Sequence, residues 1–194
     1  MLTNFAEELD IFIRTTQLYL FPWIYCFIGL WGFNILNWLS GSPLNILGIY
    51  PRHFFSLFGI LFSPILHKNF NHLFFNSIPL FVLGLAILAK GLPLFFKVTS
   101  IVVFLGGFAV WLFGRRAMHI GASGLVSGYF GYILATAYFD PSFTALLLAL
   151  VVVYYFGSIF FGIFPQEDKI SWESHLLGFL SGIASALLPI HLSF

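Results

Sequence analysis

Residues 121–131 read GASGLVSGYFG, and residues 174–186 read SHLLGFLSGIASA. In the second stretch, small residues recur at every fourth position: Ser174, Gly178, Gly182 and Ala186. Residues with this spacing lie on one face of a helix. In a membrane, faces of small residues let two helix backbones approach closely. Since the first stretch is similarly rich in glycine and serine, the two stretches predict a pair of tightly packed helices.

The composition is that of a membrane protein. Of the 194 residues, 60% are hydrophobic and only 8% are charged, and the mean hydropathy is +0.98. About a quarter of the residues of a soluble domain are charged. We therefore expect one membrane domain over 1–194, solvated by the lipid bilayer, with no soluble domain attached.

Charge and cysteine content exclude other classes of protein. The net charge is +1 and basic residues form no cluster, so nucleic acid is not an expected partner. Cys26 is the single cysteine, so neither an intrachain disulfide nor a cysteine metal site can form. The histidines are too scattered for a recognisable ligand set, and we expect neither a metal nor an organic cofactor.

Apolar runs bounded by Lys, Arg, Asp, Gly and Pro predict six membrane-spanning helices. Their expected ranges are 18–39, 72–89, 92–113, 123–139, 142–164 and 175–192. Consecutive spans are antiparallel, so the second, fourth and sixth begin at one end of the bundle, together with the three longer connections. The fold class is thus an all-α polytopic bundle with one elaborated end.

Two segments outside the spans are expected in the membrane interface. Residues 1–17 carry apolar residues at helical spacing, which favours a short amphipathic helix. The connection 40–71 contains an apolar run, 54–66, that is too short to span and is interrupted by Gly59 and Pro64. We expect this run to lie in the interface or to be partly re-entrant.

The polar positions that matter most for chemistry all fall at the elaborated end. His72 and Asn76 begin the second span, Ser123 begins the fourth and His175 begins the sixth. A serine hydroxyl becomes nucleophilic when a histidine takes its proton. Ser123 also starts a helix, where free backbone N–H groups can stabilise an oxyanion, and Gly121 beside it lets substrate approach. His72 and Asn76 share a helix face and could supply further donors.

Each of these motifs also has a purely structural interpretation. Gly-x-Ser-Gly is common as a packing motif, and a histidine at a helix start is often only a hydrogen-bonded filler. Their joint occurrence at the starts of alternate spans favours a site. A wet cavity is expected there, with these polar residues as its candidate lining: His67, Asn69, Asn71, His119 and Ser171.

The ordered series of motifs resembles the rhomboid intramembrane serine proteases of the compact six-span prokaryotic type. The matching residues are, in chain order, Arg52, His67, His72, Asn76, Gly121 to Gly124, His175, Gly178 and Gly182. The resemblance implies a Ser123–His175 dyad without a carboxylate, and an oxyanion site formed by His72, Asn76 and the Ser123 N–H. It implies transmembrane proteins as substrates, and the fifth span as a lateral gate.

The chain departs from the rhomboid pattern at two positions. Pro51 stands where a Trp commonly precedes the loop arginine, and Ser127 stands where a Tyr commonly stacks on the catalytic histidine. We consider Tyr129 or Tyr132 as a substitute for that stacking residue. The family topology implies a multi-pass protein of the prokaryotic inner membrane, with the site open to the extracytoplasmic side.

The count of basic residues favours the opposite orientation. The elaborated end carries five of them, against three at the other end. Two alternative functions stay open. One is a proteolytically inactive rhomboid-like protein that binds membrane clients. The other is a small transporter, against which stands the lack of an internal repeat.

Overall fold

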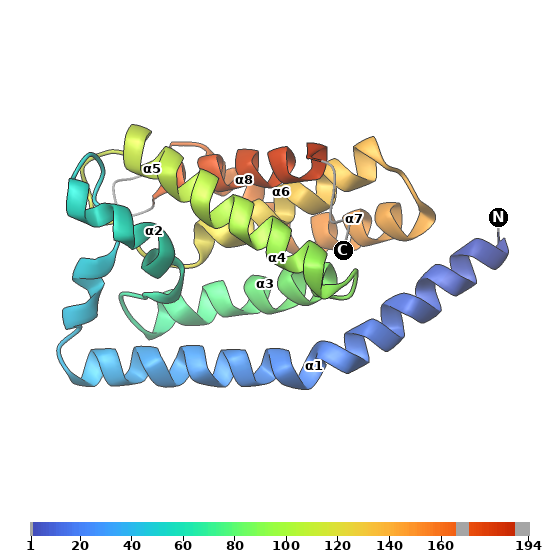
Figure 1. The fold of residues 1–194 in the computed structure, drawn as a ribbon, viewed down its shortest axis with the longest axis horizontal. Coiled ribbons are helices and arrows are strands. Elements are labelled where there is room, and N and C mark those ends of the chain that lie inside the picture. Colours follow the sequence, from blue (N-terminus) through green and yellow to red (C-terminus); the bar gives the residue numbers. More distant parts are fainter. Residues whose placement is uncertain (1, 166–170, 189–194) are drawn as a thin grey trace.

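The computed structural model describes residues 2–165 and 171–188. It is an all-α bundle, 82% helical (Figure 1). In chain order the elements are α1 (Leu2–Leu39), η1 (Pro43–Leu47), η2 (Phe54–Phe58), α2 (Gly59–Phe62), η3 (Ser63–Ile65), α3 (Phe70–Leu88), α4 (Leu92–Ile101), η4 (Val102–Gly106), α5 (Gly107–Phe113), α6 (Ser123–Phe139), α7 (Phe143–Phe156), η5 (Gly157–Ile163) and α8 (Trp172–Leu187). The π-helical turn η4 joins α4 and α5 into one rod, whereas the other η elements are 3₁₀ turns.

The helices agree with the predicted spans. α6 covers 123–139 to the residue, and α4, η4 and α5 together cover 92–113. α3, and α7 with η5, agree within two residues at each end. The sixth predicted span, 175–192, begins inside α8, and its last residues lie outside the described part of the chain.

Four helices of the described chain are long and apolar enough to cross a membrane: Phe5–Leu39, Phe70–Leu88, Leu92–Phe113 and Phe143–Ile163. α6 and α8 are shorter, with 17 and 16 residues. More than half of α6 is buried, and it contacts α3, α4, α7 and α8. The core forms around it, with Tyr129, Phe130 and Leu83 almost completely enclosed. A central helix that is covered by its neighbours does not itself need to match the full bilayer thickness.

The predicted amphipathic segment 1–17 is the first part of α1, which continues as one helix with Pro22 inside it. Figure 1 shows that α1 lies along α3, bends near its middle and projects at its N-terminal end beyond the other helices. Its first half contacts α7, where the rings of Phe5 and Phe143 lie 4.4 Å apart and Thr144 donates to Glu8. Two tryptophans fasten the rest of α1 to α3. Trp23 donates to the carbonyl of Phe81, and Trp31 donates to the hydroxyl of Ser77. The position of 1–17 in the membrane interface stays a prediction.

The starts of α3, α6 and α8 lie at one end of the bundle, as predicted, together with the connection 40–71 (Figure 1). That connection forms the short turns η1, η2, α2 and η3. It presents Phe54, Phe55 and Phe58 outward, each at least 65% exposed. Exposed aromatic side chains suit a lipid-facing or interfacial surface better than a solvated loop.

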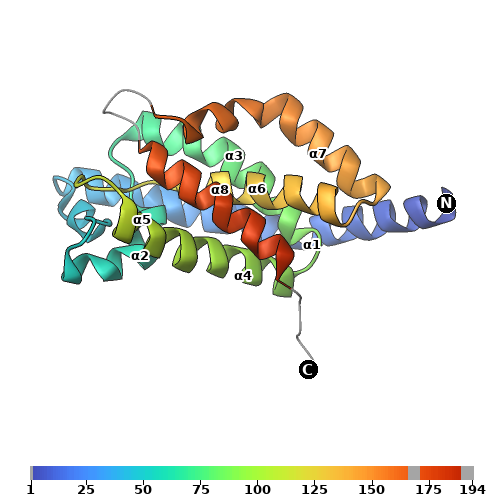
Figure 2. The ribbon, with the colours of Figure 1, turned by 90° about the horizontal axis from the view of Figure 1, so that it is seen from above.

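α6 and α8 pack along their whole lengths, and Figure 2 shows α8 beside α6, with α4 on one flank and α7 on the other. A Cβ atom on Gly178 would overlap the carbonyl oxygen of Gly124, and one on Gly182 would overlap that of Gly128. The two backbones thus touch where the small residues lie. The prediction of a tightly packed helix pair is confirmed.

Replacing Gly182 by Ala should therefore lower stability. The added methyl group would overlap the backbone of Gly128, and this overlap is relieved only if α6 and α8 move apart. Overpacking of this kind costs about 1–3 kcal/mol, so we expect the thermal unfolding midpoint in detergent micelles to fall by roughly 3–10 °C. Gly29→Ala is the matched control, because nothing lies within 4 Å of its added Cβ. An unchanged midpoint for Gly182→Ala would contradict the backbone contact.

Candidate active site

Ser123 is the first residue of α6, and the turn before it is held by the connection 40–71. Gly121 has a φ of +115°, a conformation that side chains disfavour. Its N–H donates to the carbonyl of Ser63 at 2.8 Å, and the N–H of Ala122 donates to Nε2 of His67 at 3.3 Å. The first N–H groups of a helix have no intrahelical partner. The N–H groups of Gly121 and Ala122 are thus occupied, and the N–H of Ser123 is the next one along the chain that can bind a ligand. Gly121 supplies space at this turn and does not supply a donor.

His72 and Asn76 face this turn from α3. A Cβ atom on Gly121 would lie 2.5 Å from Nε2 of His72 and 3.5 Å from Nδ2 of Asn76. Nδ1 of His72 accepts a long hydrogen bond, 3.5 Å, from the N–H of Lys68, which favours the tautomer with the proton on Nε2. One N–H of Asn76 donates to the carbonyl of His72 at 3.0 Å, and its amide has a second. Both side chains can present an N–H donor beside Gly121.

His175 lies in the first turns of α8, and a backbone carbonyl orients its ring. Nδ1 is 3.1 Å from the carbonyl oxygen of Gly162 in η5. A carbonyl can only accept, so Nδ1 carries the proton and Nε2 of the neutral ring keeps its lone pair. A Cβ atom on Gly162 would overlap Nδ1, which explains why glycine suits this position. Sequence reasoning missed this contact, since a backbone acceptor leaves no side-chain signal.

The two tyrosines considered as stacking residues for His175 are both part of the core. The hydroxyl of Tyr129 pairs with that of Thr99 at 2.7 Å, and its ring lies in the core near Phe95. Tyr132 is likewise buried in the core. The group that orients the His175 ring in the described chain is the carbonyl of Gly162.

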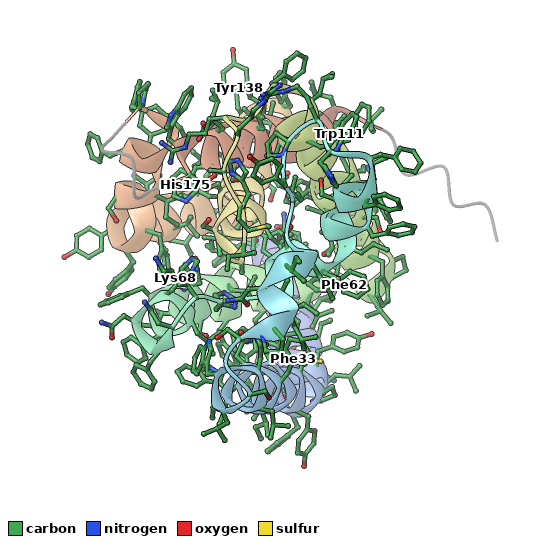
Figure 3. All side chains as sticks on the ribbon, turned by 90° about the vertical axis from the view of Figure 1, so that its left-hand side faces the viewer. Phe33, Phe62, Lys68, Trp111, Tyr138 and His175 are labelled. Atoms are coloured by element: carbon green, nitrogen blue, oxygen red, sulfur yellow. The ribbon has the colours of Figure 1, made fainter. Side chains whose placement is uncertain are left out.

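Ser123, His175, His72 and Asn76 line one cavity of about 600 Å³ at the elaborated end of the bundle. Its other lining residues are Lys68, Asn69, Asn71, Phe75, Met118, Ile120 and Ser171. Figure 3 looks onto this end, with Lys68 and His175 on the same flank. Backbone contact holds the two sides together, because a Cβ atom on Gly124 would lie 3.1 Å from the carbonyl oxygen of Ser174. These two residues directly follow Ser123 and precede His175.

Of the five polar residues expected to line the cavity, Asn69, Asn71 and Ser171 do so. His67 and His119 are buried instead, at 0% and 3% exposure. The N–H of His67 donates to Asn34 of α1, and its ring packs edge-on against His72 with centroids 5.1 Å apart. His67 thus links α1, the turn before Ser123 and the start of α3.

No group of three or more His, Cys, Asp or Glu side chains within residues 2–165 and 171–188 could hold a metal ion. Close to the start of α8, Nε of Arg115 lies 3.5 Å from Oε1 of Glu173, which is 6% exposed. Besides Lys68, the cavity lining offers hydroxyls, imidazoles and amides, which suit acyl transfer.

The fold and the site together define a class of protein. It is an all-α membrane bundle whose end cavity contains Ser123 and the two histidines His72 and His175. Residues 55–191 match the family model described as the Rhomboid domain. The chain therefore belongs to the rhomboid family, and it is an integral multi-pass membrane protein.

Relatives occur in mycobacteria. The chain is 37% identical over 164 residues to uncharacterized proteins of Mycobacterium bovis and Mycobacterium tuberculosis, covering 80% of this chain and 68% of each relative. An uncharacterized protein of Mycobacterium leprae has the same identity, over 80% of this chain and 65% of its own length.

Burial of His67 should make stability pH-dependent. Burial, aided by the nearby His72 and opposed by the carbonyl of Ile65, lowers the pKa of His67 from 6.5 to about 4. Below about pH 6.5 the unfolded chain takes up a proton that the folded chain excludes until about pH 4. The free energy of unfolding should fall through this window, by up to about 3 kcal/mol at its acid end.

His67→Gln tests this dependence, because the amide oxygen can still accept from Ala122 but does not titrate. We expect the variant to lose less stability than the wild type between pH 7.5 and 5.5, followed by thermal unfolding in micelles. His53→Gln is the control, since His53 is exposed in the same connection. Equal pH dependence of the wild type and His67→Gln would refute the assignment.

Proposed function

We propose that this rhomboid-family protein is a serine endopeptidase that cleaves transmembrane helices of other membrane proteins. The observation that carries the proposal is the common cavity of Ser123, His175, His72 and Asn76, brought together from α3, α6 and α8. Its position at one end of the bundle suits water entry. α6 has 17 residues and is about 25 Å long, shorter than the ~30 Å hydrocarbon core, so its serine end can lie below the membrane surface.

In the proposed reaction Ser123 Oγ attacks the carbonyl carbon of the scissile peptide bond. Nε2 of His175 takes the hydroxyl proton, and Nδ1–H stays bonded to Gly162. The carbonyl oxygen becomes an oxyanion, which the N–H of Ser123 and the donors of His72 and Asn76 stabilise. The C–N bond then breaks, and His175 gives its proton to the leaving amine. Water hydrolyses the acyl-enzyme by the same steps, with His175 again as the base.

The dyad has no carboxylate partner in this proposal. Glu173 is two residues before His175, and its Oε1 accepts from the N–H of Arg115 at 3.3 Å. It is therefore engaged with the connection before α6. The carbonyl of Gly162 takes the orienting role that a carboxylate has in a catalytic triad, without adding a negative charge.

A fluorophosphonate probe tests the nucleophile in detergent or liposomes. We expect covalent labelling of the wild type, none of Ser123→Ala, and a loss of about 10⁴-fold or more in kcat for His175→Ala on a transmembrane test substrate. His72→Ala should lower kcat by about 10²–10³-fold, as for removal of one oxyanion donor. Thermal unfolding of each variant provides the control for folding.

If the correctly folded wild type is not labelled, or if Ser123→Ala is labelled equally, the protease proposal fails. The client-binding alternative would then be favoured, because the family fold would remain without chemistry.

We further propose that the cavity opens to the extracytoplasmic side of a prokaryotic inner membrane, with 1–17 and 54–66 in the interface. The exposed Phe54, Phe55 and Phe58 support the interfacial position of the second segment. The fold family supports the orientation, against the five-to-three excess of basic residues at the cavity end.

Thiol labelling tests this orientation in a Cys26→Ala background. We expect a membrane-impermeant maleimide added to intact cells to label Met118→Cys, at the cavity, but not Lys90→Cys, at the opposite end. Both positions are exposed, so both variants should react once the membrane is permeabilised. The reverse pattern in intact cells would overturn the proposed orientation.

A further inference from the structure

His119 joins three segments at the elaborated end. It lies four residues before Ser123 and is 3% exposed. Its backbone forms an antiparallel bridge with Ile49, with N–H to oxygen bonds of 2.8 and 3.0 Å. This pairing fixes the connection before α6 against the connection 40–71. The side chain is thereby turned towards the start of α8.

The hydrogen bonds of the His119 ring define its tautomer. Nε2 is 3.0 Å from the carbonyl oxygen of Arg115, which can only accept, so Nε2 carries the proton. Nδ1 of the neutral ring then accepts from the hydroxyl of Ser171 at 2.5 Å. Burial lowers the pKa of His119, against opposing effects of the Arg115 carbonyl and Glu173, and thus favours the neutral ring.

Ser171 lies four residues before His175 and lines the cavity. Its hydroxyl also pairs with that of Ser174 at 2.7 Å, and Ser174 is 3.3 Å from Nδ1 of His119. The bond between His119 and Ser171 therefore connects the residues that lead into α6 and α8, one turn's length of chain before each proposed catalytic residue.

The hydrogen bond between His119 and Ser171 fixes a direction, which the glycine contacts between α6 and α8 do not. Small residues let α6 and α8 approach, but a van der Waals contact, unlike a hydrogen bond, has no preferred direction. Transfer of a proton between Ser123 and His175 requires alignment within a fraction of an ångström. The hydrogen bond of the His119 imidazole to Ser171 fixes the distance between the segments that precede α6 and α8.

We propose that His119 is a positioning residue that aligns Ser123 with His175 through its bond to Ser171. This inference rests on the proposed function, because it assumes that these two residues form a dyad. It assigns a role to a side chain that touches neither the cavity nor the substrate.

The test measures the thiol introduced by Ser123→Cys in a Cys26→Ala background. A thiol beside a histidine has a lowered pKa, which the pH dependence of its alkylation reports. We expect His175→Ala to raise the alkylation midpoint by at least about one pH unit, and His119→Phe to raise it by a comparable amount. His119→Asn, which keeps an acceptor near the place of Nδ1, should restore most of the shift.

Kinetics of the serine enzyme give a second measurement. We expect His119→Phe to lower kcat about 10–100-fold with KM nearly unchanged, as for misalignment of reacting groups. The matched control is Tyr129→Phe, which removes the buried hydrogen bond to Thr99 inside the core. It should lower the unfolding midpoint to a similar degree and leave both kcat and the thiol midpoint unchanged.

The outcomes separate the two hypotheses. A thiol midpoint that does not respond to His175→Ala would overturn the dyad, and the role of His119 with it. A midpoint that responds to His175→Ala but not to His119→Phe would overturn the positioning role and leave the proposed function intact. Equal effects of His119→Phe and Tyr129→Phe on kcat would also overturn it, because a loss of general stability would then explain both.

Discussion

The contact between the backbones of α6 and α8 is the constraint on which the rest of the site depends. In lipid, the burial of leucine contributes little to helix association, so close packing of small residues takes that place. Gly178 against Gly124 and Gly182 against Gly128 bring the helix axes so near that no side chain fits between them. Because α6 and α8 both begin at the elaborated end, the same contact places Ser123 and His175 in one cavity. The contact between α6 and α8 therefore both stabilises the bundle and forms the site.

The polar groups at that end are supported by partners from the connections, since unpaired polar groups would be costly in apolar surroundings. The carbonyl of Ser63 and the ring of His67 each take one N–H of the turn before Ser123. Asn34 of α1 in turn binds the backbone of His67. The connection 40–71 thus acts as a scaffold for the turn as well as a cover for the bundle. In the proposed enzyme this arrangement leaves the Ser123 N–H for the oxyanion.

Features carried by periodic patterns could be predicted from the sequence, and features carried by backbone atoms could not. Apolar runs gave the ranges of α3, α4 to α5, and α6 within two residues, because lipid demands long uninterrupted apolar helices. The order of Ser123, His175, His72 and Asn76 along alternate spans also predicted their meeting in one cavity. The carbonyl of Gly162 was missed because every residue has one. Tyr129 was considered near His175, yet its hydroxyl finds Thr99 on α4, a contact that helix spacing alone does not reveal.

A carbonyl as the partner of His175 has a consequence for the proposed chemistry. A buried carboxylate would stabilise the imidazolium strongly, but its own charge would be expensive to keep at membrane depth. A carbonyl dipole fixes the tautomer without that cost and stabilises the imidazolium less. Correct alignment must then contribute more to the rate, since less comes from charge. This is the physical reason for rigid supports around the proposed dyad, of which the bond between His119 and Ser171 is one.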